Sequence, residues 1–305
     1  MAAACLGHTN SEIVYHEESY KWDLLAAAIY LNNTPMLAEL AHLGQSCGEG
    51  IMLGDPYAVA IICCNSKAFE LLLRGNNHDS GRYLHRLLPK VTEYGTLDML
   101  EKWLQLDEVK LCSARTLEKA LFTPKIENFD MLARFIEEQR KDWVIQPSLS
   151  ICLRRATRKG WEEMVRHLLS LGAPAGGYNL LSAICRGGFE NIVRMLPEHG
   201  AKFEGYEVAN AAKEGRWEMV RLLVDDYGAD INDGDPPPVV SAVAYEREDI
   251  FRELLQREAI LHNGIGTKAV YRARKDGLES MLLLLQEHGI DITEVTKQAT
   301  ESAST

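Results

Sequence analysis

A few neighbouring ionisable side chains are the residues of this chain that could do chemistry. Glu214 directly follows Lys213, and Glu93 directly precedes Tyr94. A carboxylate held beside a cation can orient a substrate or transfer a proton, so Glu93, Tyr94 and Glu214 are the candidate catalytic residues. The chain contains no Gly-x-Ser-x-Gly, His-Glu-x-x-His or phosphate-binding glycine motif. The sequence therefore offers catalytic candidates without a catalytic motif.

The histidines and cysteines lack the spacing of a metal site. His199 and His288 each lie in a Glu-His-Gly sequence, which is typical of the last turn of a helix, where a histidine interacts favourably with free carbonyl groups. Seven cysteines are scattered without the paired short spacings of a zinc site. We predict no metal and no cofactor, and we expect reduced thiols in an intracellular protein.

The elements that must position these residues belong to a segment of about thirty residues that recurs along the chain. Two clear copies, 161–173 and 216–229, align on Gly160 and Gly215. The register extends to nine positions, spaced by 27 to 33 residues: Asn32, Cys64, Gly95, Glu127, Gly160, Gly188, Gly215, Glu246 and Gly277. Self-similarity at this period predicts a stack of repeats, a solenoid.

Each copy has the pattern of two short helices. Seven and four residues before the register position stand an apolar and a small residue, such as Leu153 and Ala156, which share one face of a first helix. Apolar residues further on, such as Val165 and Leu168, mark one face of a second helix that ends at Gly172. Each unit is therefore predicted to be a helix hairpin.

This pattern resembles the ankyrin repeat over residues 22–291. In the best copy, Ala211 and Gly215 are followed by Val220, a Leu-Leu pair and Gly-Ala-Asp at 228–230. The family's opening Thr-Pro-Leu-His is replaced, for example by Ile-Cys-Leu-Arg at 151–154. The resemblance implies an all-α, ankyrin-like helix-hairpin solenoid of about nine stacked repeats with short β-hairpin or loop fingers.

The domain prediction is one repeat array at 22–291. We expect residues 1–21 to be an N-terminal cap or flexible segment and residues 292–305 to be a polar, disordered C-terminal tail. No apolar run reaches the 18 residues that a membrane span requires, and the first residues lack the pattern of a secretory signal. The expected location is cytoplasmic or nuclear.

The charges are distributed unevenly along the predicted array. The formal net charge is −11, which argues against general nucleic-acid binding. The resemblance implies a concave groove lined by first helices and loops, and its C-terminal half is basic at Arg155, Arg158, Lys159, Arg186, Lys213, Arg272 and Lys275. Such charge attracts an anionic partner, whereas the alternative is a solvated face whose arginines pair with Glu214 and Asp276.

The N-terminal half of the predicted groove carries aromatic and aliphatic side chains instead. Trp22, Tyr30, Tyr94 and Phe122 occupy the equivalent positions. Large rigid side chains dominate binding hot spots, so they suggest an anchoring patch. The alternative is that these repeats partly cover one another, or that residues 1–21 fold over them.

The predicted function is that of an intracellular scaffold or adaptor that recognises an acidic partner protein in the groove. The alternative is a stand-alone small-molecule-binding protein or non-classical enzyme that uses the groove as an active site for an anionic substrate with a carboxylate or phosphate. Enzymatic activity is left open, and the fold resemblance disfavours it. Neither a nucleic acid nor a membrane is expected as a partner.

Overall fold

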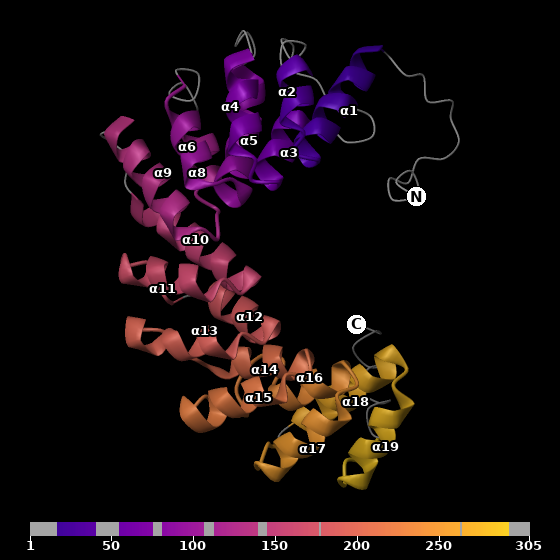
Figure 1. Ribbon diagram of the computed structural model, residues 1–305. Coiled ribbons are helices and arrows are strands. Elements are labelled where there is room, and N and C mark those ends of the chain that lie inside the picture. The colour runs from indigo at the N-terminus through magenta and orange to yellow at the C-terminus, as the bar shows by residue number, and fades with distance from the viewer. Residues whose placement is uncertain are drawn as a thin grey trace, which may run out of the picture. The chain divides into compact units, whose positions relative to one another are not determined.

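The architecture is a succession of short helix pairs. The computed structural model describes residues 17–40, 55–75, 81–106, 113–139, 145–176, 178–262 and 264–292. Within these ranges every regular element is helical, and the helices form nine consecutive pairs (Figure 1). The predicted all-α stack of helix hairpins is thereby confirmed. Loops join the pairs in the described ranges, where no strand forms.

The chain divides after Ser148 into two compact units, which are described separately. In the first unit the first helices α1, α3, α5 and α8 pack in one row, and the second helices α2, α4, α6 and α9 pack in another. The bounds are α1 (Glu17–Tyr30), α2 (Thr34–Leu40), α3 (Pro56–Ile62), α4 (Ser66–Gly75), α5 (Gly81–Tyr94), α6 (Leu97–Leu104), α8 (Ala114–Ala120) and α9 (Ile126–Gln139).

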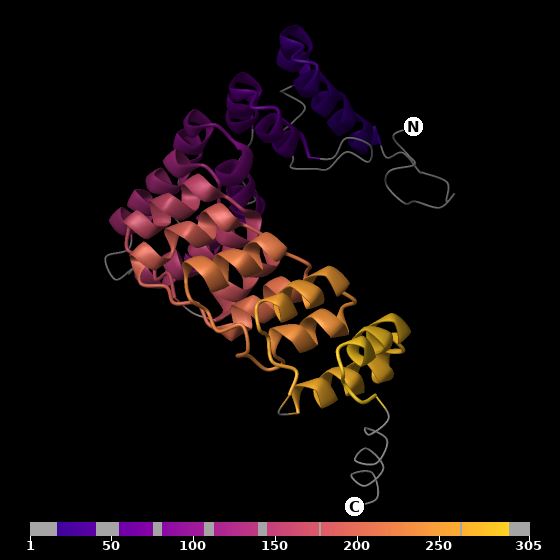
Figure 2. The same cartoon turned by 90° about the horizontal axis from the view of Figure 1, so that it is seen from below.

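The second unit repeats this layout, visible in the orange and yellow ribbon of Figure 2. Its first helices α12, α14, α16 and α18 contact one another in chain order. The bounds are α10 (Ile145–Lys159), α11 (Glu162–Ser170), α12 (Tyr178–Gly187), α13 (Glu190–Met195), the 3-10 helix η3 (Pro197–His199), α14 (Gly205–Lys213), α15 (Trp217–Arg221), the π-helix η4 (Leu222–Asp226), α16 (Pro238–Ala244), α17 (Glu248–Gln256), α18 (Ile265–Asp276) and α19 (Glu279–Glu287).

The core lies between the two rows of helices, where the sequence register places apolar and small residues. The predicted first-helix core residues are buried, namely Leu25, Ala28, Ala60, Leu88, Leu153, Ala156, Leu181, Val208, Ala211, Val239, Ala242, Val270 and Ala273. The second-helix residues Val165 and Leu168 are also buried. Alanine at the recurring position lets neighbouring first helices approach closely, and a larger side chain there would overpack the interface.

The turn between the two helices of a hairpin uses a left-handed residue. Seven of the nine register positions have φ between 50° and 73°: Asn32, Cys64, Gly160, Gly188, Gly215, Glu246 and Gly277. Gly95 is not left-handed, but it has no room for a side chain, because an added Cβ would lie 2.5 Å from the carbonyl oxygen of Val91. The repeat register thus predicted most of the turns correctly.

The register is wrong in the fourth hairpin, where Glu127 lies inside α9 instead of in a turn. The first helix, α8, already ends at Ala120. Pro124 disfavours helical backbone at Thr123, and the Thr123 hydroxyl accepts a hydrogen bond from the Lys125 backbone N–H at 3.1 Å. The turn therefore comes several residues earlier than the repeat period predicts.

The ends of the predicted array also differ in detail. Residues 17–21, assigned to the N-terminal cap, are the start of α1. Residues 1–16 and 293–305 lie outside the described residues. The single array over 22–291 stays a prediction.

Candidate binding surfaces

The cations predicted to bind a partner lie on the first helices of the second unit. Arg155, Arg158 and Lys159 are exposed on the last turns of α10, and Arg186 is exposed at the end of α12. Their helical neighbours Leu153 and Ala156 are buried. Since successive helical residues point about 100° apart, burial of one face turns the cations outward.

Four of these cations share one register position, two residues before the turn residue: Arg158, Arg186, Lys213 and Lys275. The first helices α12, α14, α16 and α18 pack side by side, so equivalent positions recur along one edge of this unit. We call these four residues the cationic row. Ala244 holds the position in α16 and interrupts the row.

The cations differ in how far neighbouring groups compensate them. Lys213 Nζ lies 4.5 Å from the centre of the Tyr245 ring, a cation–π contact. Arg272 Nε lies 2.8 Å from a carboxylate oxygen of Asp276 on the same helix, so the alternative of local pairing holds for this arginine. Arg158 and Lys275 have no ion pair within the described part of the chain. Within the cationic row, these two are the members that no ion pair or aromatic contact of the described residues compensates.

Most ion pairs in the described part of the second unit involve acidic residues on its second helices. Arg194 Nη1 lies 3.0 Å from Asp226 Oδ2, and Arg257 pairs with Asp225. These contacts join neighbouring repeats through exposed pairs, each of which contributes at most about 1 kcal/mol. The cationic row lies on the first helices and takes no part in these ion pairs.

The first unit exposes large apolar side chains at its turns instead. Tyr30, Ile62 and Tyr94 are the last residues of α1, α3 and α5, and 71%, 62% and 47% of their surfaces are exposed. Successive turns are tied together, since Asn65 Nδ2 donates to the carbonyl oxygen of Ile29 and the Cys64 thiol donates to that of Tyr94. The three side chains therefore form one apolar edge.

Two further residues of the predicted anchoring patch are less accessible. Phe122 is half-buried in the turn that follows α8. Trp22 is only 9% exposed, so the expectation that it faces a partner is wrong. It lies in the core because Ala26 and Ile29, one and two turns later on α1, share its buried face.

The catalytic candidates are divided between the two units. Glu93 is half-buried at the end of α5 in the first unit, whereas Glu214 is exposed after α14 in the second. Lys213, the cation beside Glu214 in the sequence, contacts Tyr245. Tyr94 accepts hydrogen bonds at its backbone carbonyl from Lys125 and from the Cys64 thiol.

In the described ranges no group of histidine, cysteine, aspartate and glutamate residues is arranged to hold a metal ion. No helix in those ranges has the length and apolar character needed to cross a bilayer.

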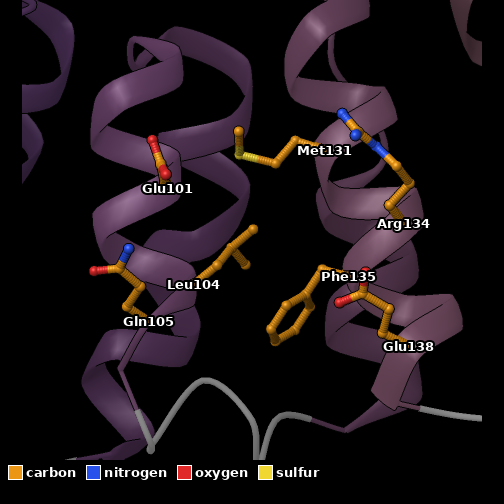
Figure 3. Close-up of a pocket in the computed structure, with 7 residues that line it drawn as sticks. All are labelled: Glu101, Leu104, Gln105, Met131, Arg134, Phe135 and Glu138. Atoms are coloured by element: carbon orange, nitrogen blue, oxygen red, sulfur yellow. The ribbon is translucent and has the colours of Figure 1, made fainter.

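The sequence did not predict a pocket of about 290 Å³ between α6 and α9, two second helices of the first unit (Figure 3). Its lining residues are Glu101, Leu104, Gln105, Met131, Arg134, Phe135 and Glu138. In the repeat pattern Met131 and Phe135 are simply apolar positions of a second helix. Their partial exposure depends on the separation of two helices, which the sequence pattern does not encode.

Comparison with known proteins gives one family match. Residues 210–236 match the family model of the ankyrin repeat. No curated protein matches the chain. Among solved structures, the human ASB11 ankyrin repeat domain is similar, with 21% sequence identity and a TM-score of 0.46, and the match covers 60% of this chain and 86% of that one.

Proposed function

Because this chain is an ankyrin-repeat protein, we propose that it binds a partner protein and that the cationic row contacts acidic groups of that partner. The family match at residues 210–236 and the nine helix hairpins support a binding role. The proposal also places the protein inside the cell, which suits the four free cysteines of the described ranges.

The cationic row is the observation that carries this proposal. A chain with a formal net charge of −11 places cations at the same register position in four hairpins of one unit. Positive charge gathered on an acidic molecule attracts an anionic partner and raises the association rate. Arg155 and Lys159 extend the row on α10, since both are exposed beside Arg158.

The apolar edge of the first unit supplies the second part of the proposal. Tyr30, Ile62 and Tyr94 offer exposed apolar surface on tied turns, and Phe122 adds a half-buried ring at the next turn. Aromatic side chains give large contact area at a small cost in conformational entropy, which makes them frequent hot spots. We propose that this edge receives apolar side chains of the partner.

The test compares charge reversal inside and outside the row. The 305-residue chain is compared with the double variant Arg158→Glu with Lys275→Glu and with the control Arg252→Glu. Each protein is used for affinity capture from cell extract with quantitative mass spectrometry. Arg252 is exposed on the second helix α17. Any partner that the wild type captures is then purified, and its dissociation constant is measured at several salt concentrations.

We expect the double variant to lose affinity by about tenfold or more and to show a smaller salt dependence, because two favourable charges become repulsive. The Arg252→Glu control should bind as the wild type does. Equal affinity and an equal salt slope for the double variant would reject the cationic row as the binding surface.

A further inference from the structure

The pocket between α6 and α9 has an apolar floor and a charged rim. Leu104 of α6 and Met131 and Phe135 of α9 point into the space between the two helices from opposite sides (Figure 3). Leu104 is buried, whereas Met131 and Phe135 are half-buried. Around them, Glu101, Arg134 and Glu138 are exposed.

Within the described residues, the α6–α9 pair lacks the ion-pair bridge that joins some other neighbouring second helices. Lys102 Nζ bonds Glu70 at 2.9 Å between α4 and α6, and Arg194 bonds Asp226 at 3.0 Å between α13 and η4. Arg134 stands 32 residues after Lys102, at the position that corresponds to Lys102 in the next repeat. Arg134 Nε instead donates a hydrogen bond to the carbonyl oxygen of Asp130, one turn earlier on its own helix.

The described residues thus provide no polar bridge from Arg134 to α6, and an apolar floor stays accessible at this place. The pocket volume of about 290 Å³ lies at the lower end for drug-sized ligands. It is open and shallow enough to receive a side chain from a chain lying across the two helices, as anchor residues do in protein interfaces.

The charged side chains at the rim determine which charge a bound segment should carry next to its apolar side chain. Glu101 and Glu138 bring two carboxylates from the two helices, and Arg134 brings one cation. The rim therefore carries a net negative charge of one, from two acids and one base. An adjacent lysine or arginine complements it, whereas an acidic residue is repelled.

We propose that this pocket is a second binding site, which takes a polypeptide segment with one large apolar side chain and a lysine or arginine within one helical turn of it. The apolar side chain contacts Leu104, Met131 and Phe135, and the basic group lies against Glu101 and Glu138. This partner chemistry is opposite to that of the cationic row. One chain would then join an acidic partner to a basic one.

The test uses a displayed library of random 16-residue peptides, selected on the 305-residue chain. Recovered peptides are synthesised, and their dissociation constants are measured by fluorescence anisotropy on the wild type and on three variants. Glu138→Arg reverses a rim charge. Glu137→Arg makes the same change at the preceding residue of α9, which is exposed but does not line the pocket. Phe135→Ala removes part of the floor, and circular dichroism checks that it stays folded.

We expect a peptide family with an apolar residue and a base within four positions. It should bind Glu138→Arg about fivefold or more weakly, and Phe135→Ala about tenfold more weakly, while Glu137→Arg leaves binding unchanged. The proposal is overturned if no recovered peptide responds to Glu138→Arg, if the responsive peptides lack the basic residue, or if Glu137→Arg weakens them equally. The two glutamate variants change exposed residues, so the comparison holds even if Phe135→Ala unfolds.

Discussion

Glu207 is a buried carboxyl group at the start of α14, in a repeat that the family model matches in part. Its Oε2 accepts a hydrogen bond from the Glu204 backbone N–H at 2.9 Å, which forms a capping box at the helix N-terminus. Burial raises the pKa of Glu207 above its ordinary value of 4.5, although these backbone hydrogen bonds oppose the rise. The same side chain therefore supports the helix and resists ionisation.

The raised pKa predicts how stability depends on pH. Between the unfolded pKa near 4.5 and the higher folded pKa, the native state binds more protons than the unfolded state, so this group lowers stability as pH rises through that window. Glu207→Gln keeps an oxygen that can accept the Glu204 hydrogen bond but removes the titration. We expect the stability of the variant, relative to that of the wild type, to be greater at pH 7 than at pH 4. Urea unfolding of both proteins at the two pH values measures this difference.

The matched control is Glu198→Gln, which changes an exposed glutamate of η3 in the same way. It measures what the loss of one exposed carboxylate does to stability at each pH value. If Glu207→Gln showed the same pH dependence as this control, the burial of the Glu207 carboxyl group would not be coupled to folding.

The burial of the cysteines follows their place in the helix hairpin. Cys152 and Cys185 lie on first helices and are buried, where a thiol packs as a small apolar side chain. Burial also raises the pKa of the Cys185 thiol, which keeps it protonated. Cys63 and Cys64 are exposed instead, because they stand at the end of α3 and in the following turn.

At the scale of the helix hairpin, two glycines with similar backbone angles serve different purposes. Gly160 and Gly172 both have left-handed backbone, with φ of 71° and 82°. An added Cβ at Gly160 would lie 2.6 Å from the ring of Phe189 in the next hairpin, whereas at Gly172 it would meet nothing within 4 Å. Only Gly160 is therefore needed for contact between repeats.

We predict that Gly160→Ala destabilises the protein more than Gly172→Ala. Each alanine adds about 1–2 kcal/mol of backbone strain, since a side chain is unfavourable at positive φ. Gly160→Ala must in addition displace the Phe189 ring, which costs about 1–3 kcal/mol more as overpacking. Urea unfolding of the two variants measures the difference. Equal losses would mean that Phe189 moves aside freely and does not fix the spacing of the hairpins.

The fourth hairpin shows the limit of a repeat register. The period placed its turn at Glu127, although α8 ends at Ala120 and α9 starts at Ile126. A local signal, Thr123 before Pro124, decided the turn against the periodic one. Seven other positions were predicted correctly, because a residue that must accept positive φ is most often glycine, and the period carried the assignment over to Asn32, Cys64 and Glu246.

At the scale of the whole molecule, contacts run between neighbouring hairpins. In the second unit α14 contacts α12 and α16, and α16 contacts α18. Stability in such an array is close to a sum of repeat and interface contributions, so a local defect acts mainly on its neighbours. A repeat protein of this kind lacks a single central core.

This organisation predicts how a core defect spreads. Val208→Ala removes a fully buried side chain from α14 and should cost about 2 kcal/mol. We expect amide hydrogen exchange to accelerate most in α12, α14 and α16 and less in α18, since α18 does not directly follow α14 in the row. Equal acceleration throughout the second unit would show that this unit unfolds in one cooperative step.

The sequence by itself determined the helix hairpin, most of its turns and its core, because each depends on residue types at a fixed spacing within one repeat. It also placed Arg158, Arg186, Lys213 and Lys275 at one register position. Only the tertiary structure decided that Trp22 is buried and that a pocket opens between α6 and α9. These features depend on rotamers and helix separations, which packing between elements sets and a one-dimensional pattern does not contain.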